Sequence, residues 1–391
     1  MRDKTKEAFF SLVRAGLFPV HGEGFKVNDS LFQDVEWEKV YQLAQEQSVL
    51  GLVLAGLEQY KNLNVNLDVN QKLLLQWIGE VQLIEQRNKT MNQFIAELVL
   101  AMRKTGIYTL LVKGQGIAQC YERPLWRACG DVDFFLSNDN YQKAKDYLVP
   151  LASSVETEGV YGKHLGMVVD GWNVELHGSL RCGLSNRVDK VLEDVLIDTF
   201  NNGNVRPWND DGVQVFMLGV ENDAFYVFNH FLGHFYKGGI GLRQVCDWCR
   251  LLYTYRDSLN YELLESRIKR AGLLSEWKAF GAFAVEYLGM PVEAMPLLEV
   301  RCKKEDGRCE IDANLRKKAD KICEFILEVG NFGHNRDMSF YHNGSYFVQK
   351  VKSFGRRCGD MISHFGIFPV GTIRFIPCIV FNGLRSAVRG E

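Results

Sequence analysis

The sequence is poor in several features that define broad protein classes. It has 8 prolines, and its 10 cysteines are spread over 391 residues, too few for the disulfide framework of a small secreted domain. It also has little excess charge, because 46 Lys and Arg oppose 48 Asp and Glu for a net charge of -2. No global basic field would attract long nucleic acid, so we expect no such partner.

Long apolar runs are missing as well. The charged N-terminus lacks the apolar core of a signal peptide. The most apolar late stretch, residues 365–381, falls short of the roughly 20 apolar residues that span a bilayer. Four residues interrupt it: Pro369, Gly371, Arg374 and Pro377. We interpret this stretch as a core or interface strip, with membrane-surface contact as the alternative, and we predict a cytoplasmic protein without a transmembrane segment.

The composition that remains is that of a globular protein, with 47% hydrophobic and 24% charged residues. The chain is long enough for two or three packed subdomains. Residues 1–105 are predicted to form a helical region. Apolar residues recur at helical spacing from 70 to 104, and Gly106 is placed to end that helix.

The pattern changes after Gly106. Residues 108–112 and 131–136 are β-type runs, and short helices are predicted between them at 116–121 and after them at 141–148. The pair Asp170-Gly171 separates two further strand-like runs, 165–169 and 172–177, which is a strong hairpin signal. We therefore predict a small α/β core over residues 106–205.

Helical periodicity returns in the last part of the chain. It covers four stretches: 213–236, 242–255, 261–271 and 274–287. The last fifty residues, rich in glycine and aromatics, are predicted to be irregular. The fold class is then α+β: a small mixed sheet with helices, flanked by an N-terminal helical region (1–105) and a C-terminal helical region with an irregular tail (206–391).

Three carboxylates stand out in the predicted core. Asp131 and Asp133 lie two apart on a strand, so both side chains leave the same face while the apolar neighbours point into the core. Glu175 lies on the second arm of the hairpin between Val174 and Leu176. Carboxylates gathered in a partly buried place persist when a cation neutralises them, and an all-oxygen set suits magnesium. Asp-x-Asp alone is also common at solvated strand edges.

A glycine-rich turn is coupled to these carboxylates through one short helix. Lys113, Gly114, Gln115 and Gly116 follow the first strand, and such a turn offers backbone amides and a cation to phosphate. Gly130 directly precedes the carboxylate pair and would let a ligand approach the backbone closely.

These residues resemble the family called uncharacterised nucleotidyltransferases, within the DNA polymerase β-like superfamily. The resemblance rests on the following segments and positions: Leu111-Val112-Lys113-Gly114, Tyr121, Pro124, Arg127, Gly130-Asp131-Val132-Asp133-Phe134-Phe135, Val174-Glu175-Leu176-His177, His230, His234, Leu242-Arg243 and Asp247. It covers about residues 35 to 260. One departure from the superfamily is typical of this family: Lys113-Gly114 replaces the usual Gly-Ser turn.

The resemblance implies transfer of a nucleoside monophosphate from a nucleoside triphosphate, such as ATP, to a hydroxyl group on an unknown small-molecule or protein acceptor. Two magnesium ions would be held by Asp131, Asp133 and Glu175. The nucleotide would be bound by six residues: Lys113, Gly114, Gln115, Arg127, Gly130 and Arg243. A salt bridge to a nearby acid is the alternative for Arg127, and pairing with Asp247 is the alternative for Arg243.

Two other readings stay open at this point. The chain could be a non-catalytic scaffold that senses a nucleotide or binds a partner, because the phosphate turn departs from the superfamily pattern. It could also be a metal-dependent phosphohydrolase that uses His230, His234 and Asp247, although a packed or site-lining histidine pair is favoured. Cys246 and Cys249 form a Cys-x-x-Cys without a second pair, which favours buried core thiols over a zinc or redox site.

Overall fold

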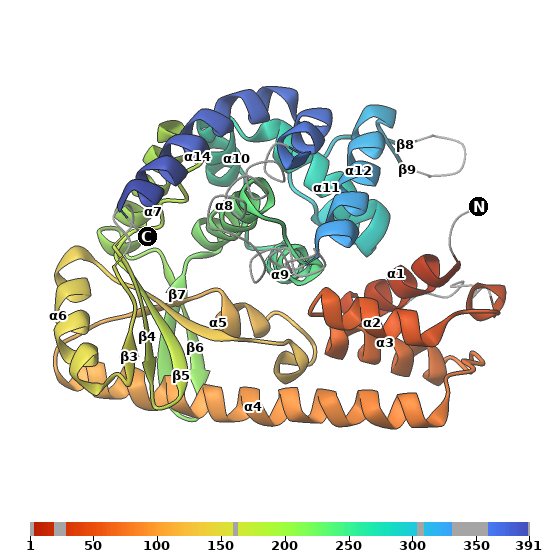
Figure 1. The fold of residues 1–391 in the computed structure, drawn as a ribbon, viewed down its shortest axis with the longest axis horizontal. Coiled ribbons are helices and arrows are strands. Elements are labelled where there is room, and N and C mark those ends of the chain that lie inside the picture. Colours follow the sequence, from red (N-terminus) through yellow and green to blue (C-terminus); the bar gives the residue numbers. More distant parts are fainter. Residues whose placement is uncertain (1–3, 19–28, 159–162, 303–308, 331–358, 390–391) are drawn as a thin grey trace. The chain divides into compact units, whose positions relative to one another are not determined.

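The computed structural model describes residues 4–18, 29–158, 163–302, 309–330 and 359–389 (Figure 1). Contacts group the chain into two compact units, which are treated separately below. The first unit comprises residues 1–83, 231–253 and 274–374, and the second comprises 84–230, 254–273 and 375–391. The division at residues 105 and 205 proposed from the sequence stays a prediction.

The second unit contains a seven-stranded sheet with the order β3-β4-β5-β2-β1-β7-β6. Its strands are β1 (Leu110–Val112), β2 (Asp131–Phe135), β3 (Ser154–Val155), β4 (His164–Val169), β5 (Trp172–His177), β6 (Val205–Asp210) and β7 (Val213–Leu218). The sheet is mixed, since β2 runs parallel to β5 and β1 runs parallel to β7, while the other neighbours are antiparallel. The predicted α+β class with a mixed sheet is confirmed.

The β4–β5 hairpin forms as predicted. Its turn consists of Asp170 (φ 49°) and Gly171 (φ 81°), the left-handed pair that a two-residue hairpin turn requires. Gly106 (φ 76°) follows the end of the long helix α4 (Gln71–Lys104), which confirms its predicted place.

Helix α4 covers one face of the sheet along its C-terminal part (Figure 1). Apolar residues at helical spacing pack there against the inward side chains of the strands. They include Met91, Ile95, Val99 and Met102 from the helix and Leu111, Val132, Phe134 and Val174 from the strands. The inward positions of β2 are at most 1% exposed, so the strand is fixed by its alternating apolar side chains and its carboxylates are fixed with it.

The expected helix over 213–236 is wrong in its first part. Residues 213–218 form β7, which pairs with β6 in a hairpin and with β1 in the sheet, and α8 (Val220–Lys237) begins only after Gly219. The sheet therefore extends beyond residue 205. The turn of this hairpin contains Asp211 (φ 45°) and Gly212 (φ 80°), so the missed signal is a second Asp-Gly pair.

Helices complete the second unit. They are α5 (Gly114–Ala118), η2 (Pro124–Trp126), α6 (Asn138–Leu148), η3 (Val149–Leu151), α7 (Asn186–Phe200), the part of α8 up to His230, and α10 (Tyr261–Ala271). Ser185 and Asn260 cap α7 and α10 by accepting hydrogen bonds from Val188 N and Leu263 N.

The first unit is mainly helical. It contains α1 (Lys4–Leu17), η1 (Asp29–Phe32), α2 (Trp37–Glu46), α3 (Leu50–Asn62), α9 (Leu242–Thr254), α11 (Leu274–Leu288), η4 (Val292–Ala294), α12 (Ala313–Val329) and the hairpin of β8 (Val300–Cys302) and β9 (Cys309–Ile311). Helices α1 and α3 approach closely at Gly16 and Gly56. A Cβ at Gly16 would lie 2.1 Å from Leu52 O, and one at Gly56 would lie 2.0 Å from Leu12 O.

The irregular tail expected from the sequence is wrong for residues 359–389, and residues 342–358 lie outside the described part. Residues 359–367 are helical, and α14 (Pro369–Arg389) follows with Pro377 inside it. Among the helices described, none is both long and apolar enough to cross a bilayer.

Candidate functional site

The candidate site lies where β2 and β5 run side by side in the second unit. The parallel register places Asp133 opposite Glu175 and Asp131 opposite Asn173. One oxygen from each of Asp131, Asp133 and Glu175 lies within 4.8 Å of the others, so the three predicted carboxylates come together. Oxygens at this spacing, all from carboxylates, form a donor set that suits a hard cation such as magnesium.

Asp133 is the buried member of the group, with 2% of its side chain exposed. Lys113 Nζ lies 2.7 Å from Asp133 Oδ1, and His177 Nε2 lies 2.8 Å from the same oxygen. A buried carboxylate needs such partners, because an unpaired charge in this environment would be costly. The site thus holds a buried ion pair between the glycine-rich turn and β2.

Glu175 is shared between two histidines. His164 Nε2 lies 3.0 Å from its Oε2, and His177 Nε2 lies 3.5 Å from the same oxygen. His164, Glu175 and His177 form a second group that could hold a metal ion. This group contains two imidazoles, so its donors suit a transition metal better than magnesium.

The site is strongly charged in its ground state. Burial lowers the pKa of Lys113, but Asp133, Tyr226, Glu175 and Asp131 together outweigh burial and raise that pKa above its ordinary value. Burial also raises the pKa of Glu175, yet hydrogen bonds from the two histidines and the charge of Lys113 bring it well below the usual range. The lysine is therefore held as a cation and the glutamate as an anion.

The same carboxylates also shift the pKa of His177. Burial lowers its pKa, while hydrogen bonds to Asp133 and Glu175 raise it, and the net direction is upward. Its Nε2–H then donates toward the carboxylate oxygens and fixes their orientation. Tyr226, on α8, has its pKa raised chiefly by burial.

The glycine-rich turn is tightly built. Lys113 has φ 58°, a conformation rare for a residue with a side chain, and it orients Nζ toward Asp133. Gly114 has φ 42°, and a Cβ there would lie 3.2 Å from Cys129 Sγ, so this position favours glycine. Gln115 is 1% exposed and donates to Asn88 Oδ1 at 2.7 Å, which ties its side chain to α4.

Three other predicted nucleotide-binding residues lie as follows. Arg127 is 9% exposed, and its Nη1 donates to Ala128 O at 3.2 Å. Gly130 is next to Asp131, and a Cβ there would meet no atom within 4 Å. Arg243 is on α9 and belongs to the first unit, so its contribution to nucleotide binding stays a prediction.

The histidine pair of α8 does not form a metal group with Asp247. Among the described residues, the groups that could hold a metal ion are the two already given, and neither includes His230, His234 or Asp247. His230 belongs to the second unit and packs near Tyr226, with ring centroids 6.0 Å apart. Cys246 and Cys249 are 0% exposed, and burial raises the pKa of both thiols, as expected for core residues.

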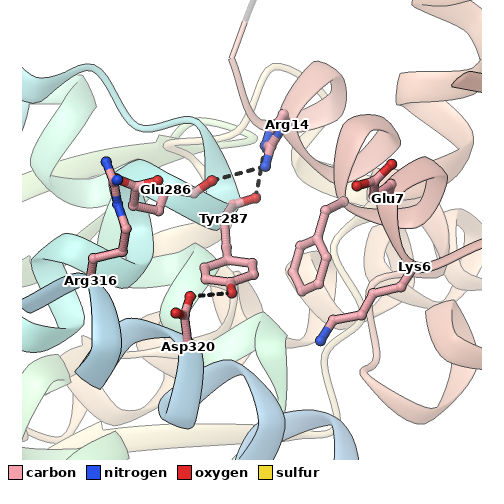
Figure 2. Close-up of a pocket in the computed structure, with 8 residues that line it drawn as sticks. Lys6, Glu7, Arg14, Glu286, Tyr287, Arg316 and Asp320 are labelled. Carbon is pink, nitrogen blue, oxygen red and sulfur yellow. Dashed lines mark hydrogen bonds and ion pairs between the residues drawn. The ribbon is translucent and has the colours of Figure 1, made fainter. Parts of the chain in front are cut away.

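A separate cavity of about 580 Å³ lies in the first unit between α1, α11 and α12 (Figure 2). Arg14 donates to the carbonyl oxygens of Tyr287 and Glu286 at 3.0 and 2.9 Å, and the Tyr287 hydroxyl donates to Asp320 at 2.7 Å. The basic and acidic side chains that line this cavity are equal in number. The carboxylates of β2 and β5 do not line it.

Sequence reasoning placed the carboxylates but missed the histidines as site residues. His177 appeared only as part of the resemblance, and His164 was not singled out. Register explains both, because His164 pairs with His177 across the β4–β5 hairpin, and His177 lies two positions after Glu175 on the same strand and so on the same face. Counting back from the Asp-Gly turn along each arm would have found them.

A family described as uncharacterised nucleotidyltransferase has a model that matches residues 33–289 of this chain. The match contains β1, β2 and β5 and every side chain of the carboxylate group. No curated protein and no solved structure matches the chain.

Proposed function

The chain belongs to the uncharacterised nucleotidyltransferase family, and on that premise we propose that it transfers a nucleoside monophosphate from a nucleoside triphosphate to a hydroxyl group of an acceptor. The observation that carries the proposal is the meeting of Asp131, Asp133 and Glu175, whose oxygens lie within 4.8 Å of one another. The acceptor would be a small molecule or a protein.

Magnesium is the proposed cofactor, and Asp131, Asp133 and Glu175 would hold it. When bound, it would neutralise phosphate charge and polarise the transferred phosphoryl group. The all-oxygen donor set supports this choice.

Lys113 would add a positive charge from the protein itself. Its side chain is 14% exposed, and its Nζ lies beside Asp133, where the strained backbone of the turn holds it. A triphosphate bound at the carboxylates would meet this cation and the backbone of Gly114. Lys113 therefore has two tasks in the proposal: it stabilises Asp133 before nucleotide binds, and it attracts phosphate afterwards.

His177 would be a positioning residue. It contacts both Asp133 and Glu175, at 2.8 and 3.5 Å, so one imidazole orients the two facing carboxylates. Hydrogen bonds of this kind orient metal ligands in general.

A non-catalytic, nucleotide-sensing scaffold is the second candidate. It is supported by the two side chains that already contact Asp133, those of Lys113 and His177, because they satisfy the carboxylate without a metal ion. In that case a nucleotide would bind without release of pyrophosphate.

The first experiment is calorimetric titration of the four ribonucleoside triphosphates, with magnesium and with a chelator. We expect binding to the native chain with magnesium, and loss of that binding in the Asp131→Asn/Asp133→Asn variant and in the chelator. Asp139→Asn/Asp146→Asn is the matched control, since it removes two exposed carboxylates of α6 in the same unit. Equal binding by the native chain and the Asp131→Asn/Asp133→Asn variant would refute the proposed site.

Pyrophosphate release then separates the two candidates. Magnesium-dependent release from a bound triphosphate, once acceptor candidates are supplied, supports transfer, whereas binding without release supports the scaffold. The proposed cytoplasmic location, where nucleoside triphosphates are available, agrees with the 10 cysteines of the sequence, which are too few for a disulfide framework in a chain of 391 residues.

A further inference from the structure

Polar side chains cross three neighbouring strands of the sheet, on the face that does not pack against α4. Asp133 on β2 lies opposite Glu175 on β5, and His177 on β5 lies opposite His164 on β4. Residues that are directly opposite, or two apart on one strand, have side chains on the same face. Glu175 therefore lies between the carboxylates of β2 on one side and the histidine of β4 on the other.

The group of His164, Glu175 and His177 has the spacing of a zinc site. His164 Nε2 and His177 Nε2 lie 3.0 and 3.5 Å from Glu175 Oε2, and one donor atom of each residue lies within 4.8 Å of the others. Ligand atoms at the corners of a tetrahedron around zinc are about 3.3 Å apart, because zinc–ligand bonds are about 2.0–2.1 Å long. The two distances to Glu175 bracket this spacing.

The chemistry of the donors points the same way. Imidazole nitrogen suits zinc and similar transition metals, whereas magnesium prefers oxygen. Two histidines and one glutamate are also a ligand set that leaves the fourth position of zinc open to water. The side chains of His164, Glu175 and His177 are 40%, 29% and 11% exposed, so an ion and its water can enter from the side of His164.

The charge of this face favours a cation. Gly166 on β4 lies opposite Glu175, and a Cβ there would lie 2.5 Å from Glu156 Oε2, so the Glu156 carboxylate occupies the space of a missing side chain. Glu156, Glu175 and the two aspartates of β2 give the face four carboxylates, which outnumber the ammonium of Lys113. This excess of negative charge attracts a divalent ion.

We propose that His164, Glu175 and His177 bind a transition-metal ion of the zinc class, and that this ion excludes the magnesium-bound triphosphate. One shared atom is the reason. His177 Nε2 lies 2.8 Å from Asp133 Oδ1 and donates its hydrogen there, but a metal ion needs the lone pair of the same nitrogen. Binding of the ion therefore ends the contact that orients Asp133, and it also engages Glu175 Oε2.

Zinc would thus act as a regulator of the site. The ion holds Glu175 and His177 on the side of β4, away from the arrangement that the carboxylates of β2 need for magnesium. The exclusion rests on the proposed nucleotide site, whereas the metal site itself is tested without nucleotide.

Calorimetric titration of the full chain with zinc chloride, without magnesium, tests the metal site. We expect one tightly bound ion per chain. His164→Ala should bind zinc at least about tenfold more weakly, since even residues that only orient a metal ligand contribute about 10- to 100-fold to affinity. Its side chain is 40% exposed, so the fold should tolerate the change.

Two further variants locate the bound zinc. His230→Ala is the matched control, because it removes a histidine of the same unit that belongs to neither metal group of the described residues. Asp131→Asn should also retain zinc binding, since Asp131 belongs to the carboxylate group alone. Equal affinity of the native chain and His164→Ala would overturn the metal site. So would a loss in Asp131→Asn or His230→Ala as large as that in His164→Ala.

A second titration tests the exclusion. A ribonucleoside triphosphate with magnesium is titrated into the native chain and into His164→Ala, with and without free zinc fixed by a metal buffer. With free zinc at about ten times its dissociation constant for the native chain, exclusive binding should weaken triphosphate binding about tenfold, and at most about twofold in His164→Ala.

The two proposals fail in different ways. Equal triphosphate affinity of the native chain with and without zinc would overturn the exclusion. A native chain that binds no triphosphate even without zinc would refute the proposed nucleotide site, and the exclusion with it. The zinc titration decides the metal site in either case.

Discussion

At the scale of single residues, the candidate site is organised around one buried carboxylate. Asp133 is 2% exposed and accepts from both Lys113 and His177 at its Oδ1. The pair Lys113–Asp133 joins the glycine-rich turn to β2, so the residue proposed to bind metal also holds the fold of the site together. Function and stability are coupled at this position.

The ion pair between Lys113 and Asp133 predicts the outcome of a double-mutant cycle. Asp133→Asn should lower the free energy of unfolding by about 3–5 kcal/mol, because it leaves the Lys113 ammonium buried without its counter-charge. Lys113→Met combined with Asp133→Asn should lose less than Asp133→Asn alone. Chemical denaturation of the native chain and the three variants measures this. Additive losses in the double variant would show that the two side chains do not stabilise each other.

At the scale of elements, the local signals in the sequence were sufficient for the centre of the sheet. The alternation in β2 and the Asp-Gly turn between β4 and β5 each depend on a few adjacent residues, and both predictions are confirmed. The helix expected over 213–236 failed because the alternating strand 213–218 runs into the apolar α8 with only Gly219 between them. A single stretch of sequence then contains both the alternating pattern of a strand and the apolar spacing of a helix.

The C-terminal helices were missed for a different reason. Glycine, proline and aromatic residues are weak helix formers, and Pro377 would end most helices. Here tertiary packing of Ile367, Phe368 and Phe375, all at most 3% exposed, compensates for the poor local preference. Burial against distant residues cannot be found by a pattern that looks only along the chain. The pairing of His164 with His177 is a different case, because the register of the hairpin follows from the Asp-Gly turn and the sequence alone could have predicted it.

The contact of α1 with α3 makes a prediction at this scale. Gly16→Ala and Gly56→Ala should each lower the free energy of unfolding by about 1–3 kcal/mol, because the new methyl group would meet a backbone carbonyl of the other helix. Gly79→Ala in α4 is the control, since a Cβ there meets no atom within 4 Å. It should stabilise by roughly 0.5–1 kcal/mol through helix propensity. Thermal unfolding of the three variants is the measurement, and a stabilised Gly16→Ala would contradict the close approach.

At the scale of the whole molecule, each unit is assembled from distant stretches of sequence. The second unit includes residues 254–273, whose helix α10 is joined to α7 by Arg267 and Asp198 at 2.6 Å. Asp198 also accepts from Asn204 and Asn202 at 2.8 and 3.1 Å. Burial raises the pKa of Asp198, but these hydrogen bonds outweigh burial and lower it.

This carboxylate makes stability depend on pH in the acid range. A pKa lowered by folding contributes stability above the unfolded value of about 3.9, and that contribution is lost as pH falls below it. The native chain should therefore exceed Asp198→Asn in unfolding free energy by on the order of 1–3 kcal/mol at neutral pH. The difference should shrink as pH falls below about 4. Urea titrations at a series of pH values measure it, and a difference that grows in acid would contradict the assignment.

The packing of α1 has a practical consequence for recombinant work. A fragment limited to the family match, residues 33–289, would omit α1 and α12. Nine residues of α1 are buried, and the backbone of α3 lies against it at Gly16 and Gly56. Removing α1 would leave the apolar surface of α3 open to water, and such a surface drives aggregation. A truncated gene designed on family boundaries should yield inclusion bodies, while the full-length gene yields folded protein.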